Sequence, residues 1–369
     1  MTVVRQAIGP ERDVVMIVET WVPGIIPLKL GAELPWGYTK PPKTLGISVI
    51  PPQIFSVEQG PTLPGPINSG LAGNIGIPHY DSSGSSQEAI HARNVLLARL
   101  CSAAFAPTWD DLRFVLRMCG ASEDFNTIFD SDTCIPQIPS NLGFLCHDTT
   151  LQMCVPSLEY RSTSWPKHVK FGGTLPRKTL DVTFDRPVWL DEVRQQGRQG
   201  SKKKKVVFTT QGTMAVDYSM CILPTIMGLS DREDIIVIAV LGVKGESLEQ
   251  APSNAIVLDY FPYDPILELA DVVVTNGSYG IFSQCALHGV PMVLAGAFSE
   301  DKPEVCNRAE YSGIGLYIRS SWPRPEEIAA GVNKVLETDK YVKRAAEISA
   351  EIEEFKCLDT VERELRKLF

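Results

Sequence analysis

Apolar runs and polar turns alternate regularly through the second half of the chain. Short apolar runs bounded by turn residues predict strands at residues 206–210, 235–240, 255–259, 271–275 and 291–295. Helical spacing of apolar positions predicts helices over residues 218–227, from about 264, and over 279–288, 325–337 and 340–368. Strands and helices that follow one another in this way predict a doubly wound parallel sheet with right-handed crossovers.

The first half of the chain carries a weaker pattern. Short apolar runs give strand candidates at residues 13–18, 45–49, 144–146, 152–156 and 169–171. Helical candidates occupy residues 25–30 and 86–116. The β-branched run at 13–18 is typical of a strand buried on both faces of a parallel sheet. Between residues 35 and 86 the chain is rich in Pro and Gly, which predicts long irregular loops of the kind that often line binding clefts.

The length of the chain favours two domains, because 369 residues exceed what a single hydrophobic core usually organises. We place a first domain at residues 1–190, a polar linker at 191–204 and a second domain at 205–369. The last helix can pack back on the first domain. The basic run that begins at Lys202 is short and follows a Gln- and Gly-rich stretch, so we interpret it as part of a solvated linker.

Composition excludes several classes of protein. Hydrophobic residues make up 44% of the chain and charged residues 21%, which is ordinary globular composition. A net charge of -9 argues against a nucleic-acid partner, because binding phosphates needs a field of opposite sign. The nine cysteines form no CxxC pair and no zinc spacing. No signal-peptide pattern and no long apolar stretch is present, so we expect a cytoplasmic protein without a stable membrane anchor.

The sharpest local feature is a turn between the strand at 271–275 and the helix at 279–288. It contains Asn276, Gly277, Ser278 and Gly280. Small residues let the backbone approach a ligand, and a helix N-terminus presents unpaired N–H groups to an anion. The turn would suit a diphosphate, although any tight strand-to-helix turn favours glycine.

A second turn of this kind follows the first strand of the same domain. It contains Gln211, Gly212 and Thr213, and it could reach the same ligand from the neighbouring strand end. A third loop is predicted at residues 299–315.

These pieces resemble, in order and spacing, the donor-binding signature of the inverting glycosyltransferases with the two-domain GT-B architecture, which include macrolide and plant secondary-metabolite enzymes. The match runs from about Val206 to the C-terminus and is closest to a microbial subgroup with a TNGGYG loop where this chain reads TNGSYG. The resemblance implies an α/β fold with two Rossmann-like domains, whose parallel sheets face a cleft. It also implies an N-terminal domain that is incomplete at its start.

Carried over by residue, the resemblance implies a donor-binding set. Asn276 takes the place of the family histidine that contacts the diphosphate, and Asn can donate only a neutral hydrogen bond. Tyr260 falls near the tryptophan that stacks on uracil, and Gln284 takes the place of the glutamate that holds the ribose. The full set is Gln211, Gly212, Thr213, Tyr260, Phe261, Asn276, Gly277, Ser278, Tyr279, Gly280, Gln284, Asp301 and Lys302.

Asp301 and Lys302 take the place of the Asp-Gln pair that reads the transferred sugar, so the lysine departs from the family pattern. Core packing for Tyr260 and a solvated polar face for Gln284 are the alternatives.

In the first half, the resemblance implies that Glu19 is the acidic partner of the catalytic histidine, with a capping carboxylate as the alternative. The family carries that histidine on a glycine-rich loop well before this partner. None of the five histidines matches that motif, although His79 and His147 lie in segments that could line an acceptor cleft. We therefore expect the chain to lack the first strands of its acceptor domain.

The resemblance implies inverting transfer of a hexose, with glucose expected, from a UDP-sugar to a hydroxyl of a small hydrophobic acceptor. No Asp/Glu/His cluster suggests a metal, so no cofactor is expected. The alternative is a catalytically silent protein that binds a nucleotide-sugar or a partner. A dinucleotide oxidoreductase is disfavoured, because no GxGxxG follows the first strand of either half.

Overall fold

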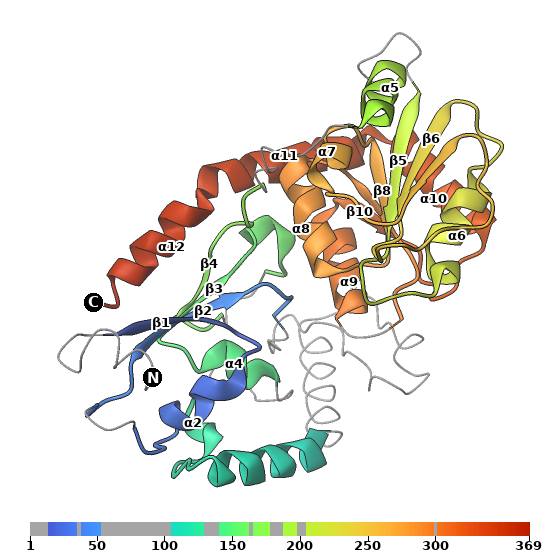
Figure 1. Ribbon diagram of the computed structural model, residues 1–369. Coiled ribbons are helices and arrows are strands. Elements are labelled where there is room, and N and C mark those ends of the chain that lie inside the picture. The colour runs from blue at the N-terminus through green and yellow to red at the C-terminus, as the bar shows by residue number, and fades with distance from the viewer. Residues whose placement is uncertain are drawn as a thin grey trace, which may run out of the picture.

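Two parallel sheets organise the computed structural model, which describes residues 14–34, 38–52, 105–128, 140–161, 165–177, 187–197, 204–298 and 301–369. The four-stranded sheet has the order β1 (Val15–Glu19), β2 (Lys43–Ser48), β3 (Thr149–Gln152) and β4 (Val169–Phe171). The six-stranded sheet has the order β10 (Gly315–Tyr317), β9 (Met292–Leu294), β8 (Val272–Thr275), β5 (Lys205–Thr210), β6 (Ile235–Val240) and β7 (Ala255–Leu258). The predicted α/β fold with parallel sheets is confirmed (Figure 1).

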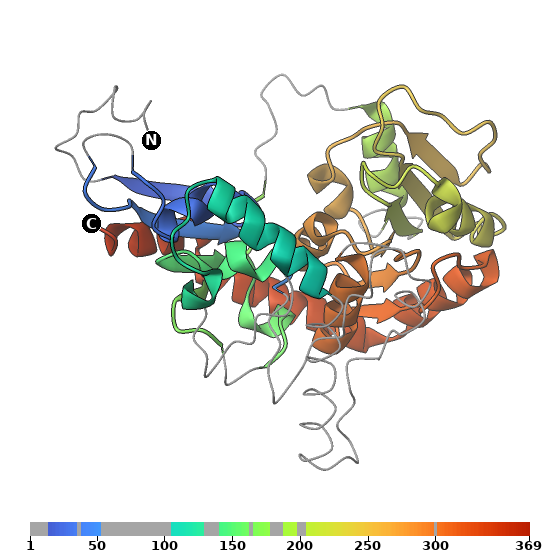
Figure 2. The same cartoon turned by 90° about the horizontal axis from the view of Figure 1, so that it is seen from below.

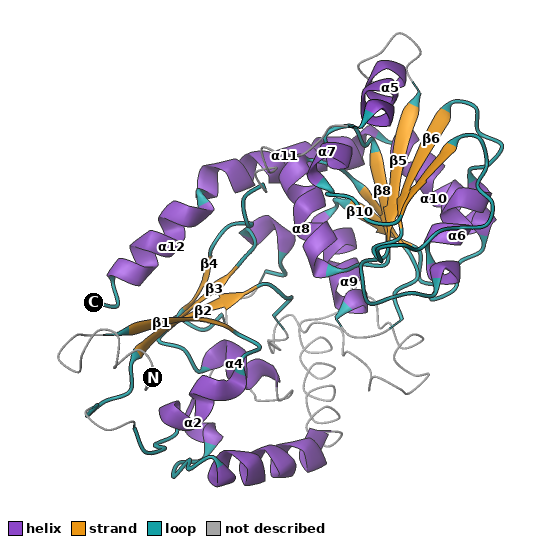
Figure 3. Cartoon of the chain, in the orientation of Figure 1, coloured by secondary structure: helices purple, strands orange, loops and turns teal. Residues whose placement is uncertain are grey.

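The six-stranded sheet is covered on both faces by helices of its own half (Figure 3). Successive side chains of β5 alternate between the two faces, so that Val206 and Phe208 join one core and Val207 joins the other. All six residues of β6 are buried, and each aliphatic side chain removed from water in this way contributes about 1.5–3 kcal/mol. One face packs against α7 (Asp264–Leu267), α8 (Tyr279–His288), α9 (Lys302–Ser312) and α11 (Asp339–Phe355). The other packs against α6 (Ile222–Gly228) and α10 (Pro325–Glu337).

The four-stranded sheet is covered in a different way. One face packs against η1 (Pro23–Ile25), α2 (Ile26–Lys29), the helical residues 105–118, η2 (Phe125–Ile128) and α4 (Ser140–Leu145). The other face is covered by α12 (Cys357–Arg366), the last helix of the chain, which follows α11 and lies on this sheet (Figures 1 and 2). Lys170 of β4 and Glu364 of α12 form an ion pair of 2.6 Å that holds this helix to the sheet.

The C-terminal helical segment bends where it passes from one half to the other. We predicted one helix over residues 340–368, and the structure has two, α11 and α12. The break is at Lys356, which has a left-handed backbone with φ 44°. Gly173 lies against this break, because a Cβ at position 173 would be 3.6 Å from Cys357 Cα. The predicted single helix is therefore wrong, and the bend lets α12 lie on the four-stranded sheet.

Several predicted elements need correction. Residues 144–146, predicted as a strand, include the end of α4. The strand predicted at 152–156 shares only Gln152 with β3, which spans Thr149–Gln152. The predicted loop at 299–315 contains α9 and the start of β10. β1 is an edge strand whose Ile17 is 56% exposed, so it is not buried on both faces. Short apolar runs fit a helix end as well as a strand, which explains the first of these errors.

Helix α5 (Val188–Gln196) lies where we placed the end of the first domain and the linker. Its Leu190 and Val193 belong to the core under the six-stranded sheet, and Trp189 contacts Phe261 edge to face with ring centroids 5.1 Å apart. The helix therefore packs with the half of the molecule that contains the six-stranded sheet. Two further short turns are η3 (Pro156–Leu158) and η4 (Tyr218–Met220). Among the described residues no helix is long and apolar enough to cross a bilayer.

Candidate functional site

The strand order of the six-stranded sheet defines a switch point between β5 and β8. From β5 the chain moves to β6 and β7 on one side, and β8, β9 and β10 then follow on the other side. In open parallel sheets, ligands bind beyond the carboxyl ends of the strands at such a point. The two turns singled out in the sequence follow these two strands, so both lie at the position that the topology favours.

The two turns touch each other. The Asn276 side-chain amide donates a hydrogen bond of 3.0 Å to the Gln211 carbonyl oxygen. Gly212 and Gly277 have φ values of 78° and 86°, a left-handed backbone that favours glycine. A Cβ at Gly212 would lie 4.0 Å from Ser278 Oγ. The structure therefore brings together the loops that the sequence placed at one ligand.

The N-terminus of α8 is open beside these turns. Ser278 is its N-cap residue and makes no side-chain capping hydrogen bond. Gly280 is exposed, and a Cβ built on it would meet no atom within 4 Å among the described residues. Uncapped N–H groups at the start of a ten-residue helix attract an anion, because the helix dipole adds to their partial charges.

The side chains of Asn276 and Gln211 are used inside the protein. Asn276 is 1% exposed and its amide is directed at the neighbouring turn. The Gln211 amide donates to the carbonyl oxygens of Ala215 and Asp217, at 2.7 and 2.8 Å, and so shapes the loop that follows β5. In this arrangement the two side chains set the loop geometry, and the main chain is the part of the site that faces outward.

A further loop at the same edge was missed from the sequence. Gly242, Lys244 and Gly245 follow β6, and the Lys244 ammonium lies 5.4 Å from the centroid of the Tyr260 ring. Hydrogen bonds from the N–H groups of Gly245 and Tyr260 lower the pKa of Asp259. Two glycines directly after a predicted strand were the signal that could have shown this loop.

The predicted uracil-side aromatics lie in different surroundings. Tyr260 is 53% exposed beyond the end of β7, so its ring is accessible. Phe261 is half-buried and packs against the core and Trp189. Of these two rings, that of Tyr260 is the one exposed enough for a base to stack on it.

The predicted ribose and sugar contacts lie on α8 and at the start of α9. Gln284 is half-buried on α8, and its Oε1 has no hydrogen-bond partner among the described residues. Asp301 is the N-cap residue of α9, and Lys302 begins that helix and is buried. The first turn of α9 packs against the turn at residues 276–280, called the donor turn below. A Cβ at Gly277 would lie 2.9 Å from the Lys302 carbonyl oxygen.

Tyr279 points away from the open end of α8. Its hydroxyl accepts a hydrogen bond of 2.8 Å from the side-chain amide of Gln152, the last residue of β3. The tyrosine predicted as a donor-binding residue therefore contacts the other half of the molecule.

Glu19 lies at the carboxyl end of β1, where the sequence placed it. Its carboxylate accepts hydrogen bonds from the Trp21 N–H at 2.9 Å and from the Thr20 hydroxyl at 3.4 Å. Within the described residues it makes no hydrogen bond to a histidine. The turn that it stabilises fits the capping alternative, and its role beside a histidine stays a prediction.

The two histidines considered for the acceptor cleft have different outcomes. His147 is buried against Gly46, with no hydrogen-bond partner for Nδ1 in the described part of the chain. Burial, together with the Lys29 charge, lowers the pKa of His147 to about 4. His79 lies outside the described residues.

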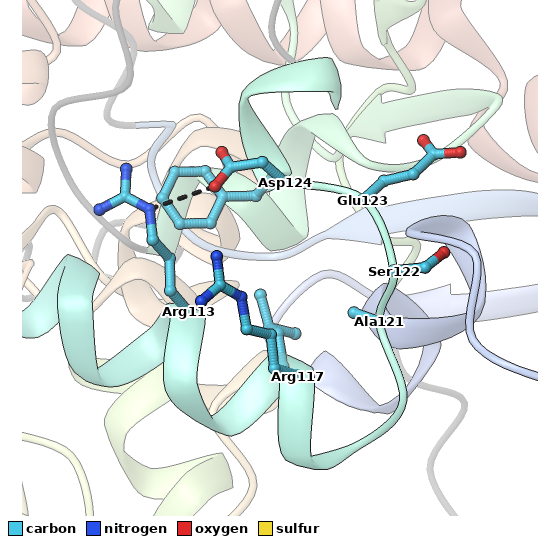
Figure 4. Close-up of a pocket in the computed structure, with 8 residues that line it drawn as sticks. Arg113, Arg117, Ala121, Ser122, Glu123 and Asp124 are labelled. Carbon is cyan, nitrogen blue, oxygen red and sulfur yellow. Dashed lines mark hydrogen bonds and ion pairs between the residues drawn. The ribbon is translucent and has the colours of Figure 1, made fainter.

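A small hollow beside η2 is not the donor site. It has a volume of about 40 Å³, whereas small-molecule sites occupy roughly 300–1,000 Å³. Arg113 at its wall is already paired with Asp124 (Figure 4), and it also pairs with Asp110. In the described residues, no group of three or more His, Cys, Asp or Glu side chains could hold a metal ion. That catalysis needs no metal stays a prediction.

Comparison with known proteins shows the family of the chain. Residues 225–367 match the family described as erythromycin biosynthesis protein CIII-like, C-terminal domain. UDP-glucosyltransferase 1 of Beauveria bassiana (strain ARSEF 2860) is 37% identical over 361 residues, covering 97% of this chain and 72% of the relative. UDP-glucosyltransferase B1 of Starmerella bombicola is 29% identical over 373 residues, covering 100% and 75%.

Solved structures establish the fold. The calicheamicin glycosyltransferase has a TM-score of 0.59 and 14% identity, covering 100% of this chain and 78% of its own. The kitacinnamycin glycosyltransferase has a TM-score of 0.57 and 17% identity, covering 98% and 78%. The fold is therefore that of the GT-B glycosyltransferases. The chain belongs to the UDP-glycosyltransferase family of secondary-metabolite type and is an enzyme of that family, which confirms the resemblance predicted from the sequence.

Proposed function

We propose that this enzyme transfers glucose from UDP-glucose to a hydroxyl of a small, largely apolar acceptor, with inversion at the anomeric carbon. The observation that carries the proposal is the meeting of the turns after β5 and β8, beside an open helix N-terminus at the switch point of the donor sheet. The names of the relatives, UDP-glucosyltransferases, support UDP-glucose as the donor.

The donor diphosphate binds to the main chain in this proposal. N–H groups at Gly277 to Gly280 stabilise negative charge as the bond between the anomeric carbon and the diphosphate breaks. These donors are fixed before reaction because both turns are locked by hydrogen bonds within the protein. Fixed dipoles can do this without a metal ion.

The nucleoside and the sugar bind on either side of the diphosphate. The accessible Tyr260 ring stacks on uracil, with Lys244 beside it. Gln284, half-buried on α8, binds the ribose hydroxyls, as the family resemblance implies. Asp301 and Lys302, at the start of α9, contact the glucose hydroxyls.

The acceptor oxygen attacks the anomeric carbon from the side opposite the diphosphate, through an oxocarbenium-like transition state. One C–O bond forms as the other breaks, and the acceptor proton passes to a base. Glu19 acts as the acidic partner that orients such a base, because it lies at the carboxyl end of β1 where ligands of parallel sheets gather. The alignment of donor and acceptor requires both halves of the molecule.

The test is release of UDP from UDP-glucose in the presence of hydrophobic alcohols, with donor binding measured by calorimetry in parallel. We expect acceptor-dependent release and a glucoside whose anomeric configuration is opposite to that of the donor. Binding without turnover would favour the silent-protein alternative. Absence of both binding and turnover would contradict the proposed donor.

Gly280→Ala tests the diphosphate position. The added Cβ meets no atom of the described residues and Ala favours a helix over Gly, so the melting temperature should not fall. If the donor occupies that space, its affinity should fall about tenfold, because one methyl group then excludes close approach to the helix amides. Gly24→Ala, where a Cβ also meets nothing, is the matched control in the other half.

A further inference from the structure

Two buried polar contacts join the two halves of the molecule. They connect the half with the four-stranded sheet, called the acceptor half, to α8 and α9 of the half with the six-stranded sheet, called the donor half. In the first, the Gln152 side-chain amide donates to Tyr279 Oη at 2.8 Å and to the Ile50 carbonyl at 2.9 Å. Gln152 ends β3 and is fully buried, and Tyr279 is the first residue of α8 and is 6% exposed. The contact therefore connects the carboxyl edge of the acceptor sheet to the N-terminus that faces the proposed diphosphate.

The second contact centres on Arg308 of α9, which is 2% exposed. Its Nε donates to both carboxylate oxygens of Glu159, at 2.9 and 2.8 Å, and one terminal nitrogen donates to the Pro52 carbonyl at 2.7 Å. The other terminal nitrogen donates to Glu304 one turn earlier on the same helix, at 2.5 Å. The Tyr160 ring lies against the guanidinium, 4.5 Å from centroid to carbon. One side chain thus fastens α9 to two separate segments of the acceptor half.

Joining two surfaces by a buried ionic cluster carries a large desolvation free energy. Two carboxylates and one guanidinium are buried together with side chains 2–3% exposed, and the cost of removing charges from water often exceeds the gain from pairing them. Apolar side chains could stabilise the same interface without this desolvation penalty. The forked geometry of arginine does something that apolar packing does not, because it fixes direction and distance.

Helix α9 in turn forms the wall behind the donor turn. A Cβ at Gly277 would lie 2.5 Å from Cys306 Sγ, and the Cys306 thiol points to the Asn276 carbonyl oxygen at 3.9 Å. A shift of α9 therefore reaches the donor turn directly. Helix α9 thus connects Glu159, which Arg308 binds, with Gly277, which lies against Cys306.

We propose that Tyr279 and Arg308 are positioning residues that hold the donor turn and the start of α9 in line with the acceptor half. The inference rests on the proposed function. Transfer to an acceptor requires the two halves to be aligned, and misplacement by about 1 Å can lower the rate about 100-fold. Binding of UDP-glucose requires the donor half alone.

Tyr279→Phe removes one hydroxyl and keeps the ring that packs in the core. We expect kcat for transfer to fall about tenfold, with the dissociation constant for UDP-glucose within about twofold of the unsubstituted enzyme. The ratio of donor hydrolysis to transfer should rise, because water needs no alignment across the halves. Tyr341→Phe, a buried tyrosine of α11, is the control and should change neither ratio nor affinity.

Arg308→Lys keeps the positive charge and loses the fork, so it should show the same split between kcat and donor affinity. Arg344→Lys is its control, because Arg344 donates to the Ser312 carbonyl and to Glu347, both in the donor half. If Arg308→Lys does not fold, Tyr279→Phe still decides the matter.

Amide hydrogen exchange tests the coupling between the two halves without requiring sugar transfer. In the unsubstituted protein, UDP should slow exchange in α8 and α9 and also at the end of β3. In Tyr279→Phe the protection should stop at the donor half. The inference is overturned if protection reaches β3 equally in the variant, or if the variants lose donor affinity as much as they lose transfer. If the unsubstituted enzyme transfers no sugar to any acceptor, the proposed function fails, and the exchange measurement still tests the positioning role.

Discussion

The two sheets are both parallel, yet they bury their strands by different means. The six-stranded sheet has helices of its own half on both faces, and all six residues of β6 are buried. The four-stranded sheet has an exposed edge strand, and one of its faces is covered by α12, which arrives from the far end of the chain. The donor half therefore covers both faces of its sheet with its own helices, although Cys154, Val155 and Leu158 of the acceptor half join one of its cores. The acceptor half depends on a helix that follows the donor half in sequence.

The largest expected effect is in the donor half, from Gly277→Ala. The residue has φ 86°, and the added Cβ would lie 2.5 Å from Cys306 Sγ and 2.9 Å from the Lys302 carbonyl oxygen. Strain and clash together should cost about 3 kcal/mol of unfolding free energy. Because the donor turn would move, kcat/KM should fall about 100-fold. Urea denaturation and steady-state kinetics measure the two effects.

Gly245→Ala separates strain from clash. This residue has φ 84°, and a Cβ on it would meet nothing within 4 Å among the described residues. Left-handed strain alone should cost about 1 kcal/mol. Equal losses of stability in Gly245→Ala and Gly277→Ala would contradict the packing of α9 against the donor turn.

The next effect concerns the pH dependence of the acceptor half. Burial, followed by the charge of Lys29, lowers the pKa of His147 from 6.5 to about 4, although Asp148 opposes this. Burial also lowers the pKa of His168. These histidines stay neutral in the folded state while the unfolded chain takes up protons below pH 6.5, so stability falls as the pH drops from 6.5 toward 4. For His147 alone the loss at pH 5 should be about 2 kcal/mol.

Hydrogen exchange at pH 7.5 and pH 5, corrected for the intrinsic rate, measures this loss in each half separately. We expect faster opening at the lower pH around α4 and β3, and a smaller change in β5 and β6. His147→Gln should open more readily at pH 7.5 but show a smaller further change at pH 5. Equal acid sensitivity in the two halves would count against the buried histidine as the cause.

The same contrast explains what the sequence could predict. Strands at 235–240 and helices at 279–288 and 325–337 match β6, α8 and α10 residue for residue, because long apolar periods bounded by caps and turns specify them locally. In the acceptor half, strands of three to six residues are separated by long connections, so the pattern could not distinguish the end of α4 from a strand. We expected that the last helix can pack back on the first domain, but the cover that α12 provides is a long-range contact, which no local period of apolar residues contains.

The candidate site divides in a similar way. Glycines and strand ends placed the turns at 211–213 and 276–280 correctly at one edge, because parallel strands end together. Side-chain directions could not be predicted. Tyr279 follows Ser278 directly and yet contacts Gln152 across the interface, since its direction depends on the position of a second domain. The loop at Gly242 was missed because its glycines lacked a family motif.

The smallest expected effect concerns α12, which follows the donor half in sequence but covers the acceptor half. Glu364 of α12 is paired with Lys170 of β4 at 2.6 Å and with Lys367 at 2.7 Å. Its burial favours protonation, but these lysines outweigh it and hold the pKa of Glu364 at about 2. The pair therefore stabilises the folded state above pH 4.5, and the contribution is lost as the pH falls from 4.5 toward 2.

Glu364→Gln should cost about 1 kcal/mol at neutral pH, because Lys170 is 40% exposed and its charge is screened by solvent. Glu362→Gln is the control, because among the described residues the ion pair of Glu362 is with Arg366, one turn further along α12. This substitution should cost about 0.3 kcal/mol. Exchange should quicken in α12 and in β4 together, while β5 and β6 stay protected. Loss of α12 protection with β4 unchanged would show that the four-stranded sheet holds its own face without the helix. The dependence of one half on the other would then rest on the remaining contacts between the halves, among them those of Tyr279 and Arg308.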